Sequence, residues 1–189
     1  MNVKVVVARF KEDISWVSNL KHEYVIFNKN EDDNSLFQYN LINKGREGHT
    51  FTNYIVDNYD SLPDYVIFLQ GNPFDHCKTV IEKINEFDFT KDFYPLGCTY
   101  IRDVEDILEE TKKYSENFGI ELNEQIKFIS GAQCIVSKKL ILKRNKESYE
   151  KIRDSFPNVS THQYSYYVEY LWPTILNFNN ELEITLYNC

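Results

Sequence analysis

The sequence predicts an α/β protein with a mainly parallel, mixed central sheet flanked by helices. Short apolar runs typical of buried strands alternate with segments whose apolar residues recur at helical spacing. Such alternation favours a parallel sheet covered by helices on both faces. The second half of the chain is less regular, so antiparallel strands are expected there. With 189 residues and 42% hydrophobic content, we expect a single domain spanning 1–189.

The first half of the chain carries the clearest strands. Val3–Arg9 is continuous and β-branched, as expected of a central strand buried on both faces. Lys11–Leu20 has apolar residues at helical spacing, and Tyr24–Phe27 predicts the second strand. The apolar positions of Phe51–Leu62 fall on one face of a helix. Tyr65–Leu69 is the third predicted strand.

The second half continues with shorter elements. Thr79–Phe87 and Val104–Phe118 predict helices on either side of a strand at Phe93–Ile101. Phe128–Val136 predicts a strand interrupted by Gly131. The remaining expected elements are helical regions over Lys138–Phe156 and His162–Leu176, the latter ended or kinked by Pro173, and an edge strand at Glu181–Tyr187.

The turn after the third strand presents Gln70, Asn72, Asp75 and His76. Ligands of open α/β sheets bind outside the carboxyl ends of the strands, so a ligand is expected at this turn. An Asp oxygen and a neutral imidazole suit a divalent cation that holds a phosphate, which makes Asp75 and His76 the candidate metal ligands. Alternatively, Asp75 caps the helix that follows and His76 is a surface residue.

A second acidic cluster follows the predicted strand Phe93–Ile101. Asp103, Glu105 and Asp106 would also suit a cation, but an acidic first turn of a helix explains them equally well. We favour the helical explanation for this cluster.

Arg46, Glu47 and His49 open the helix before the third strand. Backbone N–H groups at a helix start favour phosphate, and Arg46 would add a bidentate donor, with His49 nearby. Gly45 and Gly48 bracket these charges and would allow a ligand to approach. The structural alternative is a helix start with an exposed arginine.

The ends of the first two strands supply further candidates. Ala8 and Arg9 close the first strand, where a nucleotide base or pyrophosphate would lie, and Asn28 leaves the second strand at the same edge. Arg9 also needs a partner, which a structural carboxylate such as Glu12 or Asp13 would provide. Asn28 and the next residue, Lys29, could contact the ribose or the base. A solvated loop is the alternative for both residues, and we favour it for Lys29.

Composition limits the possible partners and location. The formal charge of −8 and a pI near 5.1 disfavour nonspecific binding to nucleic acid. The four cysteines are widely spaced and show no zinc-type pairing, which favours a reducing compartment. The N-terminus resembles a strand rather than a signal peptide, and no apolar run is long enough to span a bilayer. These features predict a cytoplasmic protein.

Four blocks of the sequence carry a resemblance that covers nearly the whole chain. They read VVVARFKEDISWV, GREGHTFTNYIVDNYDSLPDYVIFLQGNPFDH, ISGAQCIVSKKLI and YVEYLWPTI. Together they resemble an uncharacterised domain-of-unknown-function family that is itself similar to glycosyltransferases of the GT-A fold. The resemblance implies a Rossmann-like, GT-A-like sheet, a nucleotide-diphosphate sugar donor, and Mn²⁺ or Mg²⁺. GT-A enzymes typically carry Asp-x-Asp after the strand matching Tyr65–Leu69, and here that stretch is Gln70–His76.

The resemblance also implies roles for residues in the second half. Gly131, Ala132 and Gln133 would lie under the donor sugar or the acceptor, although packing explains Gly131 equally well. Glu169 would be the base that takes the acceptor proton in an inverting transfer, because a partly desolvated carboxylate among aromatic rings has a raised pKa. A solvent-facing helical glutamate is the alternative.

The resulting hypothesis is a metal-assisted glycosyltransferase that uses a nucleotide-sugar donor and a glycan or other hydroxyl acceptor. The alternatives are a metal-dependent nucleotidyltransferase or phosphohydrolase, and a non-enzymatic module that binds nucleotide or glycan.

Overall fold

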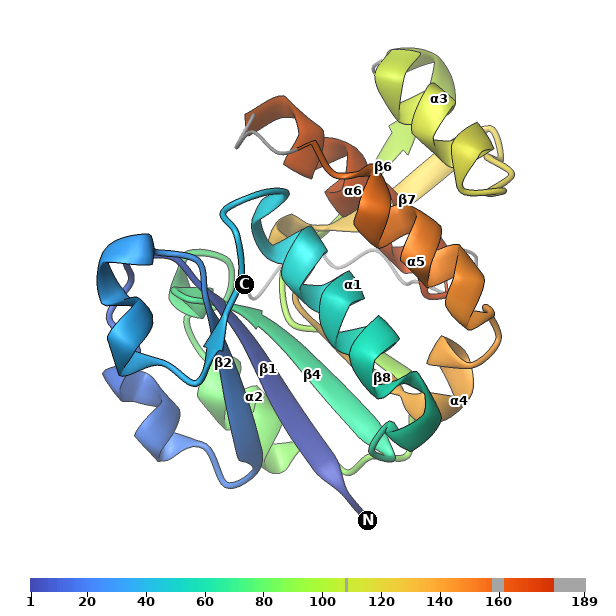
Figure 1. Cartoon of the computed structure of the whole chain (residues 1–189). Coiled ribbons are helices and arrows are strands. Elements are labelled where there is room, and N and C mark those ends of the chain that lie inside the picture. The colour runs from blue at the N-terminus through green and yellow to red at the C-terminus, as the bar shows by residue number, and fades with distance from the viewer. Residues whose placement is uncertain (108, 158–161, 179–189) are drawn as a thin grey trace.

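A computed structural model describes residues 1–107, 109–157 and 162–178, and for 162–165 the backbone only. In these residues a six-stranded sheet has the order β3-β2-β1-β4-β8-β5 (Figure 1). The strands β1, β2, β3 and β4 are parallel, whereas β8 is antiparallel to both β4 and β5. The prediction of a mainly parallel, mixed sheet is therefore confirmed.

The elements of this part of the chain have the following bounds. The central sheet contains β1 (Val3–Arg9), β2 (Glu23–Asn28), β3 (Tyr39–Asn40), β4 (Tyr65–Gln70), β5 (Phe93–Pro95) and β8 (Cys134–Ser137). A separate antiparallel pair contains β6 (Thr99–Asp103) and β7 (Gln125–Ile129). The α-helices are α1 (Arg46–Asn58), α2 (Val80–Glu86), α3 (Glu109–Asn117), α4 (Lys138–Ile141), α5 (Lys146–Ser155) and α6 (His162–Ile175).

Helices cover both faces of the central sheet (Figure 1). Alternating residues of each strand point to opposite faces, so Val6 and Phe68 pack toward α1, α5 and α6, whereas Val7 and Leu69 pack toward α2. Burial on both faces explains why β1 and β4 are almost continuously apolar. Trp172 of α6 is fully buried in the larger cluster, in contact with Phe68.

The strand order creates a switch point between β1 and β4. From β1 the chain passes to β2 and then β3 on one side, and α1 leads it back to β4 on the other side. Crevices at such points lie outside the carboxyl ends of the strands and are the usual ligand sites of open α/β sheets.

The predicted strands Phe93–Ile101 and Phe128–Val136 are each divided between the two sheets. β5 pairs with β8 in the central sheet, and β6 pairs with β7 in the small sheet. The pairing register shifts by one residue across the bend between them. At the bend, a Cβ on Gly97 would lie 2.4 Å from the carbonyl oxygen of Ser130, and Gly131 has φ +70°. These glycines allow the paired segments to leave the central sheet together.

Three other elements differ from the expectation. The predicted helix Lys11–Leu20 is only a 3₁₀ turn at Ser15–Asn19. The region Lys138–Phe156 contains two helices, because Ser137 caps α4 and Asn145 caps α5 through side-chain hydrogen bonds. Pro173 lies inside α6, two residues before its end. The predicted edge strand Glu181–Tyr187 lies outside the described residues.

The cysteines correct one expectation. Cys77 and Cys134 are free and buried, but Cys98 is disulfide-bonded. The expectation that the cysteines are reduced is therefore wrong at Cys98.

No helix in the described part of the chain is both long enough and apolar enough to cross a membrane.

Candidate functional site

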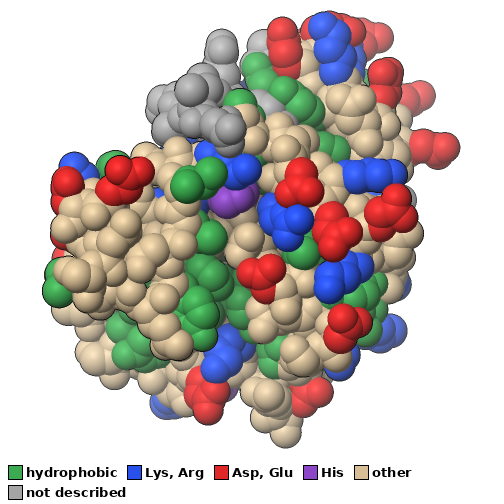
Figure 2. Space-filling model, in the orientation of Figure 1, with side chains coloured by type: hydrophobic (Ala, Val, Ile, Leu, Met, Phe, Trp, Pro, Cys, Tyr) green, Lys and Arg blue, Asp and Glu red, His purple; other side chains and the backbone are tan. Residues whose placement is uncertain are grey.

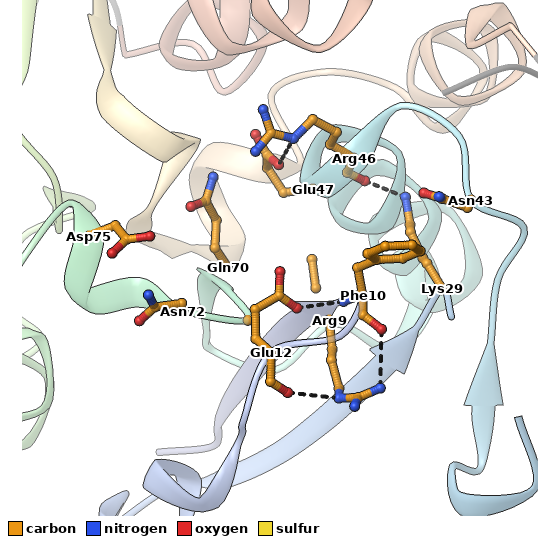
Figure 3. A pocket seen from close by; sticks show the side chains of 12 residues that line it. Arg9, Phe10, Glu12, Lys29, Asn43, Arg46, Glu47, Gln70, Asn72 and Asp75 are labelled. Carbon is orange, nitrogen blue, oxygen red and sulfur yellow. Dashed lines mark hydrogen bonds and ion pairs between the residues drawn. The ribbon is translucent and has the colours of Figure 1, made fainter. Parts of the chain in front are cut away.

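A pocket of about 550 Å³ lies at the carboxyl ends of β1, β2 and β4, at the switch point of the sheet (Figure 3). Its walls come from the loop after β1, the end of β2, the start of α1 and the turn after β4. The lining residues are Ala8, Arg9, Phe10, Glu12, Lys29, Asn43, Arg46, Glu47, Gln70, Gly71, Asn72 and Asp75. The prediction placed Ala8, Arg9, Arg46, Gln70 and Asp75 at this site, and all five line the pocket.

The start of α1 forms one wall. Gly45 and Arg46 both have positive φ, 57° and 44°, which is an unusual conformation for the arginine. In the described part of the chain, no side-chain hydrogen bond caps the first turn. Arg46 pairs with Glu47 through Nε and Oε2 at 3.7 Å, and Glu47 is only 6% exposed. The pocket therefore meets a helix N-terminus, an arginine and a buried carboxylate on one side.

Lys29 holds this strained turn in place. Its Nζ donates hydrogen bonds to the carbonyl oxygens of Lys44, at 2.6 Å, and Arg46. Burial lowers the Lys29 pKa to about 7, a shift that the Glu47 carboxylate opposes and the Lys44 charge reinforces. Lys29 is thus a positioning residue for α1, and its amine is only partly protonated near neutral pH.

Arg9 organises the loops after β1 and β2. Its guanidinium donates to the carbonyl oxygens of Phe10 and Glu12, to Asn28 Oδ1 at 2.8 Å, and to Asp33 Oδ2 at 2.9 Å. The partner carboxylate is therefore Asp33, and neither of the two predicted carboxylates, Glu12 and Asp13, has this role. Because these donors are used within the protein, Arg9 shapes the pocket rather than offering a full set of donors to a ligand.

Asn28 is fully buried and does not line the pocket. Its Oδ1 accepts from Arg9 and from the backbone N–H of Asn30, and its Nδ2 donates to the Asn30 carbonyl and to the side chains of Asn34 and Asn40. Asn28 therefore fixes the loops around the pocket instead of facing it.

Glu12 connects the loop after β1 to the turn after β4. Its Oε2 accepts from the backbone N–H groups of Phe10, at 2.7 Å, and Lys11, at 3.1 Å. A Cβ on Gly71 would lie 2.4 Å from the same oxygen, so only glycine fits there without displacing the carboxylate. The indole N–H of Trp16 donates to the Gly71 carbonyl at 2.9 Å and fixes this turn from behind.

Gln133 supports the turn from the other side. The side chain is fully buried, accepts from the backbone N–H of Gln70 at 3.2 Å, and donates to the carbonyl of Pro73. Gly131 lies against His76 and Gln70, and a Cβ there would lie 2.6 Å from His76 Cδ2. Ala132, Gly131 and Gln133 therefore lie behind the pocket wall, where they position its residues.

Asp75 and His76 differ in their surroundings. The exposed Asp75 side chain faces the pocket and has no hydrogen-bond or ion-pair partner among the described residues (Figure 3). His76 is half-buried against Gly131. Within the described residues no side-chain hydrogen bond caps α2, which begins after Thr79, so capping does not account for Asp75.

Few side chains at this site could bind a metal ion. Within residues 1–107, 109–157 and 162–178, no group of three or more His, Cys, Asp or Glu side chains could hold a metal ion. Asp75 fits an oxygen ligand and His76 is its sequence neighbour, so an ion here would take its remaining ligands from phosphate and water. In the alternative cluster, Asp103 ends β6 and accepts from Gln125 at 2.7 Å, whereas Glu105 and Asp106 lie in the 3₁₀ turn that follows.

Glu169 of α6 lies beside the pocket. Its Oε1 accepts from the backbone N–H of Gly131 at 3.1 Å. The Glu169 pKa is raised to about 7, mainly by burial and also by the Glu47 carboxylate, while the Gly131 hydrogen bond and the Arg46 charge oppose the shift. The interaction with Glu47 and Arg46, which line the pocket, connects this carboxyl to the site.

His49 faces away from the pocket. Its ring is buried against Phe156, with 5.6 Å between the ring centroids, and Nδ1 has no hydrogen-bond partner among the residues that the structure describes. Burial lowers the His49 pKa to about 3, and nearby Lys29 contributes to the shift. Gly45 and Gly48 pack against Phe156 in the same way, so packing rather than ligand approach accounts for these glycines.

Sequence reasoning did not select several residues that line the pocket. Phe10, Glu12 and Asn43 were not proposed as ligand contacts, and Lys29 was judged a solvated loop residue although it is buried. The only signal for Lys29 was its position directly after a buried strand, next to Asn28.

Comparison with known proteins identifies a family. The chain matches the family described as "Protein of unknown function (DUF3431)" over residues 5–91 and 76–189. The protein belongs to this family. The expected membership of a family of unknown function is thereby confirmed. No curated protein and no solved structure matches the chain.

Figure 2 shows the face of the protein that α1 and α5 cover. Charged side chains of both signs are scattered over these helices, and apolar side chains gather between α1 and the β2–β3 edge.

Proposed function

We propose that this protein is a metal-assisted glycosyltransferase with a GT-A-like fold, and that it transfers a sugar from a nucleotide-diphosphate donor to an acceptor hydroxyl. The observation that carries the proposal is the Glu169 carboxyl beside the pocket, with a pKa of about 7. A general base works best when its pKa lies near the working pH. The location of the pocket at the switch point supports a nucleotide ligand.

The charges of the pocket favour an anionic ligand accompanied by a cation. Three carboxylates line it, from Glu12, Glu47 and Asp75. Arg9 and Lys29 direct their donors to protein acceptors, which leaves little positive charge for a diphosphate. The uncapped start of α1 and the Arg46 side chain, which is 42% exposed, supply part of what is needed.

A divalent ion would supply the remaining charge, by neutralising the leaving diphosphate. Asp75 would hold it through a carboxylate oxygen, and His76 would hold it through the imidazole if its side chain turned away from Gly131. Arg46 would bind the phosphates from the opposite wall, and the N–H groups of the first turn of α1 would orient them.

Glu169 would accept the acceptor proton. The acceptor oxygen attacks the anomeric carbon, the bond from that carbon to the diphosphate oxygen breaks, and the proton moves to Glu169. Gly131 would hold the carboxylate in place through its backbone N–H. Attack from the side opposite the diphosphate would invert the anomeric configuration.

A transfer assay tests the proposal. The protein would be incubated with Mn²⁺, a panel of nucleotide sugars and hydroxyl acceptors, and release of nucleoside diphosphate would be measured. We expect release that depends on the acceptor, increases as pH rises through about 7, and falls about 10²- to 10⁴-fold in Glu169→Gln. Glu116→Gln, on the exposed side of α3, is the control.

Three results would contradict the proposal. Release that is independent of any acceptor would identify a phosphohydrolase, and the absence of release with every donor would exclude glycosyl transfer. Full activity of Glu169→Gln would show that Glu169 is not the general base.

A further inference from the structure

The Glu12 carboxylate is held in one orientation at the wall of the pocket. Its Oε2 accepts from the backbone N–H groups of Phe10, at 2.7 Å, and Lys11, at 3.1 Å. Gly71 packs against the same carboxylate, because an added Cβ there would lie 2.4 Å from Oε2 and 2.8 Å from Cδ. The other oxygen, Oε1, points into the cavity on the side of Gln70 (Figure 3). The pocket therefore contains a fixed acceptor with one oxygen turned toward the space that a ligand would fill.

This carboxylate is not paired with a cation. The Arg9 guanidinium donates to the backbone carbonyl of Glu12 and to Asp33, rather than to the Glu12 side chain. None of the ion pairs formed by the described residues includes Glu12. A half-buried carboxylate with a free oxygen favours a ligand that brings hydrogen-bond donors of its own.

Two side-chain amides adjoin Glu12 in the same pocket. Gln70 ends β4, Asn72 follows in the turn, and Gly71, which packs against Glu12, lies between them in sequence. Neither amide forms a side-chain hydrogen bond within the described part of the chain. A carboxylate only accepts hydrogen bonds, whereas an amide both donates and accepts, as a hydroxyl group does. Neighbouring hydroxyl groups of a sugar ring would therefore satisfy the carboxylate and the amides together.

The charges of the pocket decide which part of a ligand lies at Glu12. Arg46 and the start of α1 attract phosphate at one wall. The Glu12 carboxylate repels phosphate from the wall that the loop after β1 forms. The neutral part of a sugar phosphate, which carries the hydroxyl groups, is thus the part that fits beside Glu12. A uronic acid would place a second carboxylate there and would be repelled.

The same side of the pocket lies next to the proposed base. An added Cβ on Gly131 would lie 3.1 Å from Cδ and Nε2 of Gln70, and the Gly131 N–H donates to Glu169. Gln70 and Glu169 are therefore both neighbours of one glycine. A sugar ring bound to Gln70 would lie close to the Glu169 carboxyl.

We propose that Glu12, together with Gln70 and Asn72, binds neighbouring hydroxyl groups of a neutral sugar ring, and that Glu12 selects against acidic sugars. Glu12 Oε1 would accept from one hydroxyl group, and the amides would bind the next. The ring is the hexose of a sugar phosphate or the ribose of a nucleotide, since both present such hydroxyl groups. The role of this sugar in a transfer reaction rests on the proposed function, whereas its binding does not.

Titration with sugar phosphates tests this subsite without a nucleotide sugar. The Kd values of hexose 1-phosphates (glucose, galactose and mannose), their uronic acid counterparts, ribose 5-phosphate and inorganic phosphate would be measured by NMR with Mg²⁺ present. We expect a neutral sugar phosphate to bind about tenfold or more tightly than inorganic phosphate and than the uronic acids. A preference for hexose or for ribose identifies the ring.

Glu12→Gln isolates the charge of the subsite. The amide keeps an oxygen for the N–H groups of Phe10 and Lys11, so the loop is retained. We expect this variant to bind the neutral sugar phosphate about tenfold more weakly, to bind inorganic phosphate as tightly as the wild type or more so, and to lose most of the discrimination against uronic acids. Asp13→Asn is the matched control, because Asp13 is exposed on the same loop and does not line the pocket. Thermal unfolding of each variant verifies that it is folded.

The outcomes separate this inference from the proposed function. Equal affinity for inorganic phosphate and every sugar phosphate, or tighter binding of the uronic acids, would overturn the subsite even if glycosyl transfer were observed. Glu12→Gln with unchanged sugar affinity, or with an equal loss of sugar and phosphate affinity, would also overturn it. Sugar binding that depends on Glu12, without turnover of any nucleotide sugar, would retain the subsite and refute the transferase.

Discussion

Glu169 combines a half-buried carboxyl with one backbone hydrogen bond and a carboxylate neighbour. Burial and Glu47 both favour its protonated form, so its folded pKa of about 7 lies above the ordinary value of 4.5. The folded protein therefore holds this proton more tightly than the unfolded chain between about pH 4.5 and pH 7. Glu169 contributes stability at low pH, and this contribution is lost as pH rises through 7.

Glu169→Gln should therefore stabilise the fold at alkaline pH while it abolishes transfer. Glutamine can still accept from the Gly131 N–H, but it does not ionise. We expect the difference in unfolding free energy between variant and wild type to grow by about 2 kcal/mol between about pH 5 and about pH 8. Urea unfolding at both pH values measures it, and other titrating groups largely cancel in the difference. A difference that does not change with pH would show that Glu169 titrates normally.

At the scale of elements, the turns at the carboxyl ends of the strands depend on close packing around glycines. Gly131 has φ +70° and lies against His76, whereas Gly119 has φ +64° with no atom within 4 Å of an added Cβ. Alanine at either position meets the same backbone penalty, of about 1 kcal/mol. Only at Gly131 does it also meet a neighbouring side chain.

Gly131→Ala should thus destabilise the protein more than Gly119→Ala, by about 1–3 kcal/mol. It should also weaken donor binding, because His76 and Gln70 would have to move. Thermal unfolding and donor titration of the two variants measure these effects. Equal stability of both variants would mean that the turn relaxes without cost.

Several elements were predictable because their signal is local. The apolar runs of β1 and β4 and the helical spacing of α1 predict the first half of the sheet. The division of Phe93–Ile101 and Phe128–Val136 was not predictable, because a strand has the same pattern in either sheet. The two sheets divide at the bend where Gly97 packs against Ser130. These residues are far apart in the sequence, so no local pattern marks the bend.

The site was likewise predictable only where its residues follow a strand that the sequence marks clearly. Asp75 and Gln70 follow a recognisable strand and lie in the pocket as expected. Asn28 and Gln133 also occupy strand ends, but their long-range hydrogen bonds turn them into the protein. Sequence alone does not distinguish an amide that faces a ligand from one that supports the wall.

At the scale of the whole molecule, two features converge on one edge of the sheet. The pocket at the switch point offers a helix start and Arg46 for a diphosphate, and the seam of β7 and α6 brings Glu169 beside it. In the proposed transferase, this arrangement would place the donor beside the base, although the overall charge is −8.

Stabilisation by nucleotide sugars tests the donor pocket most directly. The melting temperature would be measured with each nucleotide sugar, with Mn²⁺ and with chelator, for the wild type and for Asp75→Asn. We predict that one donor raises it by about 5–10 °C at roughly 100 times its Kd, and that chelation or Asp75→Asn removes most of this shift. No shift with any nucleotide sugar, or an equal shift in Asp75→Asn with chelator, would contradict the account.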